Sequence, residues 1–360
     1  MINDLIAGQF GHVALHKEIR SRLISVKEFG AVGDGVTDDR ATIQSAIDAA
    51  SNHSTIYFPH GYYFIEGEGT ELLLIDKPLR IKGETTATTL LVGADVGSST
   101  DIIRVDISGT VRNLSFERFT IIPQSGTPGK NGINIDVSDE GQQIAELLIS
   151  RVHIYSLGGN AIYLTNPTAI NAFYHSWIEK CVLYKGINLQ RCGDSVSICD
   201  NIITGSGIGI NVSVQYGGVS QLLISHNNIT CKSGAIRLES GDQTKIVYNQ
   251  IEVPVGWDTS IGNDALIDID GNDGSQLIMA EIVSNNINGN CQKVIKPTNL
   301  IRVNYATDLV IRDNNLQKGE GASILVTSNA IDTRIDHNHW GNAEIAPSIE
   351  DLGTNTWTLP

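Results

Sequence analysis

The sequence predicts an all-β fold, a right-handed parallel β-helix in which short strands wind into a solenoid capped by a short N-terminal helix. A polar turn recurs eight times between Leu147 and Trp340, at steps of 20 to 36 residues. Short runs of Val, Ile and Leu flank each turn and show no helical periodicity, and 36 glycines against 9 prolines suit many tight turns. A period in this range, carried by strands alone, is typical of a solenoid in which each coil contacts only its neighbours.

The central position of the repeated turn is Asn in six of the eight copies. Asn tolerates the left-handed backbone of a tight turn, and its amide can hydrogen-bond to the same group one coil above and below. We therefore expect one stacked column of side chains at this position. Its members are Val152, Cys181, Asn201, Asn227, Asn249, Asn285, Asn314 and Asn338.

The start of the chain differs from the repeats. We interpret its first residues as an arm or adaptor. A capping helix is predicted near residues 39–50, because the apolar residues there fall on one helical face and Asp38 or Asp39 can serve as the N-cap. Such a helix would cover the open strand edge of the first coil. The predicted division is 1–24 for the arm, 25–340 for the β-helix and 341–360 for a C-terminal tail too irregular to form another coil.

The opening of the chain also carries a family resemblance. Residues Val26 to Ala50, followed by Thr55 to Tyr63, resemble the opening of the pectate-lyase-like superfamily of right-handed β-helices. That superfamily includes polygalacturonases, pectate lyases, fructan-cleaving lyases and the tailspike depolymerases of bacteriophages. The lead-in from Gly8 to His16 is similar to segments of phage tail proteins in the superfamily. The resemblance covers about residues 8–65, and the repeats extend it to about residue 340. The paired-Asp and Gly-His-Gly motifs of polygalacturonases are absent.

A second strand lies between successive Asn turns, and its alternation predicts which side chains face outward. Ile at the second place and Leu, Val or Ile at the fourth face the lumen, so the third and fifth places face solvent. Stacked at ~4.8 Å per coil, each outward place forms a column. The third places are Tyr163, Asn188, Asn211, Arg237, Asp268, Arg302 and Leu325. The fifth places are Thr165, Gln190, Ser213, Glu239, Asp270, Asn304 and Thr327.

These columns contain candidate catalytic residues. Glu239 and Asp270 fall on adjacent coils at the same place, and two like charges in contact favour one protonated and one ionised carboxyl. A protonated and an ionised carboxyl can act as the general acid and as the nucleophile or base of glycosidic cleavage. Asp268 is a third candidate for these roles. A separation of roughly 5 Å between coils suits a retaining reaction, and ~6.6 Å between Asp268 and Asp270 suits an inverting one. The sequence leaves both open. It also leaves open a purely structural ion ladder from Arg237 through Asp268 to Arg302.

The remaining candidate residues would bind the substrate. Trp257 is either a stacking platform for a sugar ring or a side chain packed on the coil wall. It lies in the loop 254–264, which with the loop 288–299 would, as the resemblance to the superfamily implies, wall a groove beside the carboxylates. The other predicted substrate-binding residues are Arg237, Arg302, Asn304, Asn211 and Asn188.

Composition excludes several partners and cofactors. The formal net charge of −15 disfavours nucleic acid and anionic membranes. There is no apolar run long enough to insert into a membrane and no signal peptide at the start. Five cysteines without a CxxC pair, and His12 and His16 without a third ligand, predict neither zinc nor any other metal. We expect reduced thiols and no cofactor.

Together the resemblance and the columns predict a phage tailspike-like depolymerase that binds and hydrolyses a bacterial surface polysaccharide. A polysaccharide lyase or a fructan lyase or transferase on the same fold is the first alternative. A non-catalytic glycan-binding or structural spike is the second. The resemblance further implies a homotrimer, attached to the virion tail through its N-terminal arm. Such a protein would be made in the host cytoplasm and would act outside the cell.

Overall fold

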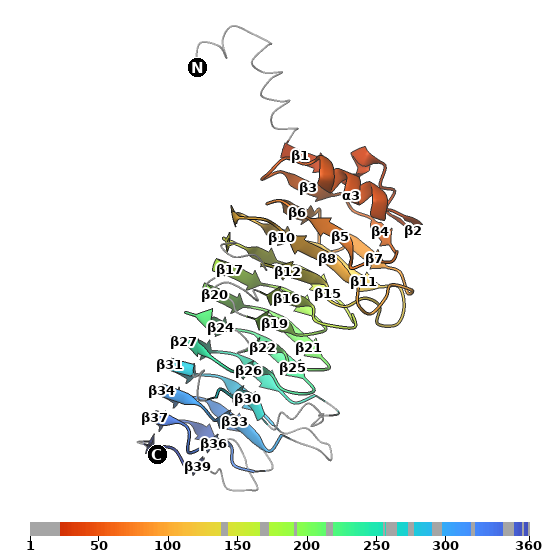
Figure 1. Cartoon of the computed structure of the whole chain (residues 1–360). Coiled ribbons are helices and arrows are strands. Elements are labelled where there is room, and N and C mark those ends of the chain that lie inside the picture. The colour runs from red at the N-terminus through yellow and green to blue at the C-terminus, as the bar shows by residue number, and fades with distance from the viewer. Residues whose placement is uncertain are drawn as a thin grey trace, which may run out of the picture.

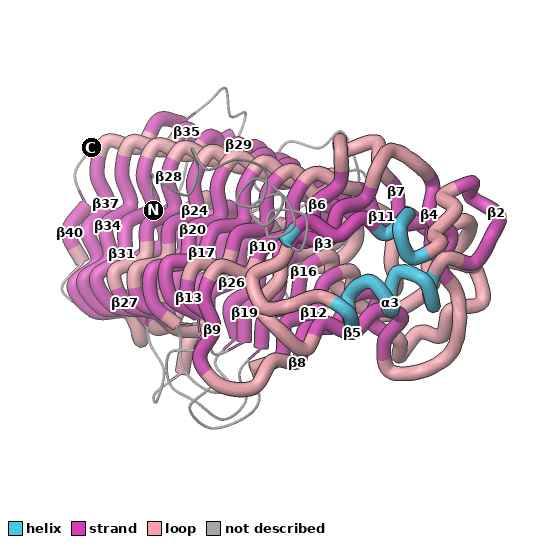
Figure 2. The backbone as a smooth tube through the Cα atoms, turned by 90° about the horizontal axis from the view of Figure 1, so that it is seen from above, coloured by secondary structure: helices cyan, strands magenta, loops and turns pink. Residues whose placement is uncertain are grey.

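The chain is a parallel β-helix, as the sequence predicts. The computed structural model describes residues 22–137, 143–165, 173–190, 193–213, 219–254, 256, 265–272, 277–289, 297–317, 321–340, 349–354 and 356–358. Within them the strands form three sheets, here named A, B and C, which run the length of the solenoid. Figure 1 shows the coils stacked from the N-terminal cap to the C-terminal end, and Figure 2 shows the same strands in rows along the axis.

The described strands pair in parallel with the same sheet of the next coil. Sheet A contains β1 (Leu23–Ser25), β3 (Thr55–Phe58), β6 (Arg80–Gly83), β9 (Thr110–Arg112), β10 (Ser115–Glu117), β13 (Gln143–Ala145), β14 (Leu148–Ser150), β17 (Phe173–Glu179), β20 (Asp194–Cys199), β23 (Val219–Ser220), β24 (Leu223–Ser225), β27 (Gly241–Asp242), β28 (Lys245–Val247), β31 (Leu277–Val283), β34 (Ala306–Arg312), β37 (Ile331–Asp336) and β40 (Trp357–Thr358). Sheet B contains β2 (Asp34–Asp38), β4 (Tyr62–Ile65), β7 (Thr89–Val92), β11 (Thr120–Pro123), β15 (His153–Ile154), β18 (Val182–Leu183), β21 (Ile202–Gly205), β25 (Asn228–Cys231), β29 (Gln250–Glu252), β32 (Asn286–Asn288), β35 (Asn315–Gln317) and β38 (His339–Trp340). Sheet C contains β5 (Glu71–Ile75), β8 (Asp101–Asp106), β12 (Ile133–Asp136), β16 (Ile162–Thr165), β19 (Ile187–Gln190), β22 (Ile210–Ser213), β26 (Ile236–Leu238), β30 (Ala265–Ile269), β33 (Asn299–Val303), β36 (Ile324–Val326) and β39 (Ile349–Asp351).

The core is a set of apolar ladders inside the solenoid. In sheet C one ladder consists of isoleucines at the same register position on successive coils, each no more than 1% exposed. Burial of one such side chain stabilises the fold by about 1.5–3 kcal/mol. Because each isoleucine packs on its own kind, the ladder fixes the register of every coil on the next. Its members are Ile103, Ile133, Ile162, Ile187, Ile210, Ile236, Ile267, Ile301 and Ile324.

The predicted asparagine column is confirmed. The Nδ2 of Asn249 donates to Oδ1 of Asn285 on the next coil at 2.9 Å, and Asn227 donates in the same way to Asn249 at 3.0 Å. The series continues from Asn201 at one end to Asn338 at the other, and each step joins neighbouring coils. Each described amide also donates to a backbone carbonyl of sheet A, so the polar column is buried with its hydrogen bonds made.

The expectation that Asn adopts the left-handed backbone in this turn is wrong. The positive φ belongs to the residue just before the column, as at His226 (φ 55°) and Tyr248 (φ 58°). Asn is suited to the column because its amide both donates and accepts along the axis, which is a requirement for hydrogen bonding rather than for backbone conformation. The preceding left-handed residues are Arg151, Lys180, Asp200, His226, Tyr248, Ser284, Asp313 and His337.

Sheet A contains a bend that the sequence did not reveal. A second column of positive-φ residues crosses it, including Gln243 (φ 52°) and Met279 (φ 51°). On several coils this residue separates two short strands, for example β27 from β28. All of its members except Met279 are polar, but their types vary and no single residue recurs as Asn does in the first column. They are Asn113, Glu146, His175, Ser195, Gln221, Gln243, Met279, Asp308 and Asp332.

The N-terminal end is closed by η1 (Val26–Phe29) and the predicted helix, α3 (Arg40–Ala49). Asp39 is the N-cap residue, but its carboxylate does not cap the helix. It accepts instead from the backbone N–H groups of Val32, at 2.6 Å, and Gly33, at 2.8 Å. Asp39 therefore fastens the preceding loop against the helix.

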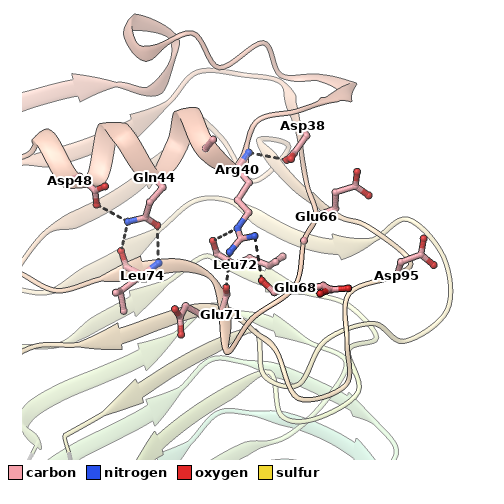
Figure 3. A pocket seen from close by; sticks show the side chains of 12 residues that line it. Asp38, Arg40, Gln44, Asp48, Glu66, Glu68, Glu71, Leu72, Leu74 and Asp95 are labelled. Carbon is pink, nitrogen blue, oxygen red and sulfur yellow. Dashed lines mark hydrogen bonds between the residues drawn. The ribbon is translucent and has the colours of Figure 1, made fainter.

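Helix α3 also satisfies the free edge of sheet C. Gln44 donates to the carbonyl of Leu74 at 3.0 Å and accepts from its N–H at 2.9 Å, as a neighbouring strand would. The Arg40 guanidinium donates to the carbonyls of Leu72 and Glu71 in the same strand, β5 (Figure 3). The first coil is thereby protected from pairing with another chain.

At the other end the sheets extend beyond residue 340, where we expected them to stop. Strand β39 pairs with β36 in sheet C, and β40 pairs with β37 in sheet A. The segment 341–360 thus contributes strands to the solenoid, although the irregular sequence around them concealed this. None of the helices among the described residues is long and apolar enough to span a bilayer.

Candidate functional site

The outward columns of sheet C have the predicted register. Arg237 of β26 lies opposite Asp268 of β30, which lies opposite Arg302 of β33. In the next column the N–H of Asp270 donates to the carbonyl of Leu238 at 2.9 Å, which sets Asp270 beside Glu239 on the adjacent coil. The structure therefore brings together the charged residues selected from the sequence.

Arg237 lies between the two carboxylates of the second column. Its Nη2 is 3.3 Å from Oε1 of Glu239 and 3.0 Å from Oδ2 of Asp270. Glu239 and Asp270 are partly exposed, at 15% and 24%. The charges of the stacked carboxylates are therefore offset by Arg237, because its long side chain reaches across from the first column to the second.

Asp268 pairs with one of the two arginines that the predicted ladder would give it. Arg302 binds it in a bidentate manner, with Nε to Oδ1 and Nη2 to Oδ2 both at 2.7 Å. Its carboxylate is only 1% exposed, and burial raises the pKa of Asp268 while the Arg302 guanidinium opposes that rise. Arg237 bonds to Glu239 and Asp270 instead, so the predicted ladder through Asp268 is not formed. Asp268 is thus buried against Arg302, and its carboxylate is not exposed on the outward face.

Asp270 has further donors. Nη2 of Arg302 is 3.3 Å from its Oδ1, and Nδ2 of Asn304 donates to the same oxygen at 3.3 Å. Thr327 and Asn329 donate to the amide oxygen of Asn304, which turns its NH₂ group toward Asp270. Asp270 is thus an oriented carboxylate held by three side chains.

Several polar atoms beside this cluster have no hydrogen-bond partner among the residues that the structure describes. They are Oδ1 of Asn211, Oγ of Ser213 and Nε of Arg237, which occupy adjacent places on β22 and β26. The amide nitrogen of Asn211 donates to Asn188 at 3.3 Å, so that side chain is already oriented. Buried polar groups almost always have a hydrogen-bond partner. Several unsatisfied polar atoms on one outward face therefore indicate a candidate binding site.

The loops predicted to wall the site lie mostly outside the described residues, and so does Trp257. Within the described part of the chain, an aromatic pair that the sequence analysis did not select lies at the corner between sheets B and C. Tyr155 and Tyr184 stack with ring centroids 4.5 Å apart and an interplanar angle of 23°. Their spacing by one coil could have been found by extending the repeat alignment to sheet B.

The sequence analysis also missed the first coils of sheet C. Arg104 and Asn134 continue the first column, and Asp106 and Asp136 continue the second. Strands β8 and β12 carry the same alternation of apolar and outward residues as those already aligned. Both strands precede the first repeated turn, at Val152, so the turn repeat does not extend to them.

A hollow of about 880 Å³ lies elsewhere, between α3 and β5 (Figure 3). Its polar groups include Arg40 and Gln44, whose hydrogen bonds close the edge of sheet C. We assign it to the cap. Among the described residues no group of three or more His, Cys, Asp or Glu side chains could hold a metal ion.

A family model supports the resemblance seen in the sequence. The model described as rhamnogalacturonase A/epimerase, pectate lyase-like, matches residues 23–264. Two relatives are similar over shorter stretches. A probable glucan endo-1,3-beta-glucosidase of Arthroderma benhamiae is 30% identical over 34% of this chain and 14% of its own length. The plasmin and fibronectin-binding protein A of Streptococcus pneumoniae is 27% identical over 52% of this chain and 24% of its own length. The chain thus spans less than a quarter of these relatives.

Solved structures share the fold over most of the chain. The A-module of the mannuronan C-5 epimerase AlgE6 of Azotobacter vinelandii covers 94% of this chain and 99% of its own, at 17% identity and a TM-score of 0.61. The ORF18 protein of Geobacillus virus E2 covers 98% of this chain and 64% of its own, at 15% identity and a TM-score of 0.56. At these identities the likeness establishes a common parallel β-helix and no more.

Proposed function

The chain belongs to the rhamnogalacturonase A/epimerase, pectate lyase-like family, and on that premise we propose that it binds a polysaccharide on the outward face of sheet C and hydrolyses it. Glu239 and Asp270 carry out the cleavage, and no cofactor takes part. The observation that carries this proposal is the pair of carboxylates around Arg237, set beside unsatisfied polar atoms on the same face. Hydroxyl groups of a sugar chain can both donate to and accept from such atoms.

The two carboxylates lie close enough together for a retaining reaction. Their oxygens contact the same nitrogen of Arg237, so they can be no further apart than those two distances combined, 6.3 Å. Retaining enzymes have carboxyl groups about 5–5.5 Å apart, and inverting ones about 6.5–9.5 Å. Asp270, held by Arg237, Arg302 and Asn304, is oriented to attack the anomeric carbon. Glu239 then protonates the leaving oxygen and later activates the water that releases the sugar.

Arg302 and Asn304 have a second role in this proposal, since each has donors that can reach a glycan hydroxyl group beside Asp270. Asn188 and Asn211 extend the same face with neutral groups. Trp257 remains a candidate platform for a sugar ring.

The biological setting that we propose is a phage tailspike. It is supported by the lead-in before residue 26 and by the fold shared with the Geobacillus virus protein. The target would be a bacterial surface polysaccharide, and the protein would be a homotrimer attached to the virion tail by its N-terminal arm. Light scattering tests the assembly: a mass near the 38.8 kDa of one chain would reject the trimer.

A specific observation favours a second candidate, a non-catalytic glycan-binding spike. Each of the three carboxylates contacts an arginine, so the cluster can also be a stable structural network. The similarity to a streptococcal protein named for binding plasmin and fibronectin is consistent with adhesion on this fold. In this case Glu239 and Asp270 orient the arginines and do no chemistry.

The deciding experiment is a glycan panel assayed for release of reducing ends, with ultraviolet absorbance recorded in parallel. The Glu239→Gln and Asp270→Asn variants are compared with the parent protein, and Glu281→Gln on sheet A is the matched control. Hydrolysis produces reducing ends without new absorbance, whereas a lyase creates an absorbing double bond. Binding without cleavage by the parent would favour the non-catalytic spike. Cleavage by both variants at the parent rate would reject the catalytic assignment.

A further inference from the structure

Sheet C carries a second charged cluster of the same build as the first. Nη2 of Arg104 on β8 lies 3.7 Å from Oδ2 of Asp106 on its own strand and 3.5 Å from Oδ2 of Asp136 on the next coil. The first cluster has the same arrangement, because Arg237 contacts Glu239, two residues further along the chain, and Asp270 on the next coil. Asp106 is 51% exposed and Asp136 21%, so this cluster also faces solvent.

A buried network supports the second cluster from below. Asp101, only 3% exposed, accepts from Nδ2 of Asn131 at 2.8 Å and from Nδ2 of Asn134 at 2.6 Å. These bonds fix Asn134, the register neighbour of Arg104. The Oδ1 of Asn134 is buried without a hydrogen-bond partner among the described residues. The second cluster thus repeats both features of the first, a bridged pair of carboxylates and an orphaned polar atom beside it.

The coils between the two clusters carry no charge on either outward column. Asp136 and Glu239 are separated by four coil steps, through β16, β19 and β22, or roughly 19 Å. The intervening places are rich in hydroxyl and amide groups, and one of their hydrogen bonds runs from the Tyr163 hydroxyl to Gln190 at 2.5 Å. The outward residues are Tyr163, Thr165, Asn188, Gln190, Asn211 and Ser213.

We infer that the two clusters anchor one glycan chain, which runs along the outward face of sheet C from Arg104 to Arg302. This inference rests on the proposed function and adds to it the class of substrate. The ligand is a polymer, because only a chain of several sugars reaches both anchors. Its repeat is uncharged, because three arginines face five carboxylates in the two clusters and the strip between them is neutral. A polyuronate would meet a net negative face.

The test measures binding as a function of chain length. Oligosaccharide series of a β-1,3-glucan and of a fructan serve as neutral probes, and mannuronan serves as the polyanionic probe. Affinities are measured in the Glu239→Gln background so that cleavage does not shorten the chain. Arg104→Ala and the double variant Asp106→Asn, Asp136→Asn remove the second anchor. Arg112→Ala is the matched control, since Arg112 lies on sheet A, where its side chain is 68% exposed and 3.9 Å from Glu146.

We expect affinity for a neutral series to rise with length until the chain spans both clusters. The second-anchor variants should bind long chains at least about tenfold more weakly, which corresponds to one lost charge-assisted hydrogen bond, and short chains as before. Thermal unfolding of each variant shows that the fold is retained, and the single Asp136→Asn variant replaces the double one if it is not.

Equal weakening for short and long chains, no weakening at all, or tighter binding of mannuronan than of the neutral probes would each overturn the inference. Failure of the parent to bind any probe would overturn it too. Failure of the proposed hydrolysis has a different signature, because length-dependent binding would then persist without release of reducing ends.

Discussion

Removal of Arg302 should lower the free energy of unfolding, because the buried Asp268 carboxylate loses its ion-pair partner. The size of this loss should depend on pH. Arg302 supplies both of the short hydrogen bonds that Asp268 accepts, each 2.7 Å long, and Asp268 is 1% exposed. The Arg302→Ala variant therefore leaves a buried carboxylate without its ion-pair partner. Breaking such a pair costs about 3–5 kcal/mol, and the nearby charge of Arg237 places our expectation near the lower limit, about 3 kcal/mol at pH 7.

The sign of the pH dependence follows from the direction of the pKa shift. Burial already raises the pKa of Asp268 above its usual 3.8, and loss of the guanidinium raises it further. A carboxyl with a raised pKa in the folded state favours the fold most when it is protonated, and that contribution is lost as pH rises through the folded pKa. The deficit of Arg302→Ala relative to the parent should thus be largest at neutral pH and shrink toward about pH 4.

Urea unfolding followed by circular dichroism, between about pH 4 and pH 8, measures this deficit. The double variant Arg302→Ala, Asp268→Asn should recover most of the stability at pH 7, because it removes the buried charge. Arg112→Ala, at an exposed arginine, is the control and should change stability by less than about 0.5 kcal/mol. A deficit that is the same at every pH and unchanged by Asp268→Asn would refute the reasoning.

The other predictions concern the catalytic pair, the ladder and the cap. Glu239→Gln and Asp270→Asn should each reduce glycan cleavage by at least ~100-fold in a reducing-end assay with little effect on thermal unfolding, since Arg237 keeps one carboxylate partner in either variant; a loss of fold instead would make the pair structural. Asn249→Ala should lower the free energy of unfolding in urea by about 2–4 kcal/mol, because buried donors and acceptors on both neighbouring coils lose their partners. A loss below about 0.5 kcal/mol would contradict a continuous ladder. Gln44→Ala should raise hydrogen exchange at the backbone of β5 and spare distant coils, because solenoid coils contact only their neighbours; uniform change along the chain would argue against a local cap.

How far the site could be predicted depended on side-chain length. The placement of Glu239 beside Asp270 was predictable, because strand alternation decides the face and the repeat decides the coil. The partners of Arg237 were not, since its flexible side chain can reach Asp268 on the first column or the carboxylates on the second. The burial of Asp268 was equally hidden, although its place on an outward column was correct.

The sequence by itself determined the solenoid, the capping helix, the asparagine column and the outward columns of sheet C. These features repeat with the backbone, and a backbone repeat is written directly in residue spacing and alternation. Only the tertiary structure decided which arginine neutralises which carboxylate, where the left-handed residues fall, and that strands β39 and β40 continue the sheets. Those outcomes depend on contacts of side chains and turns with the coils above and below. They are therefore determined jointly by residues that are far apart in the sequence.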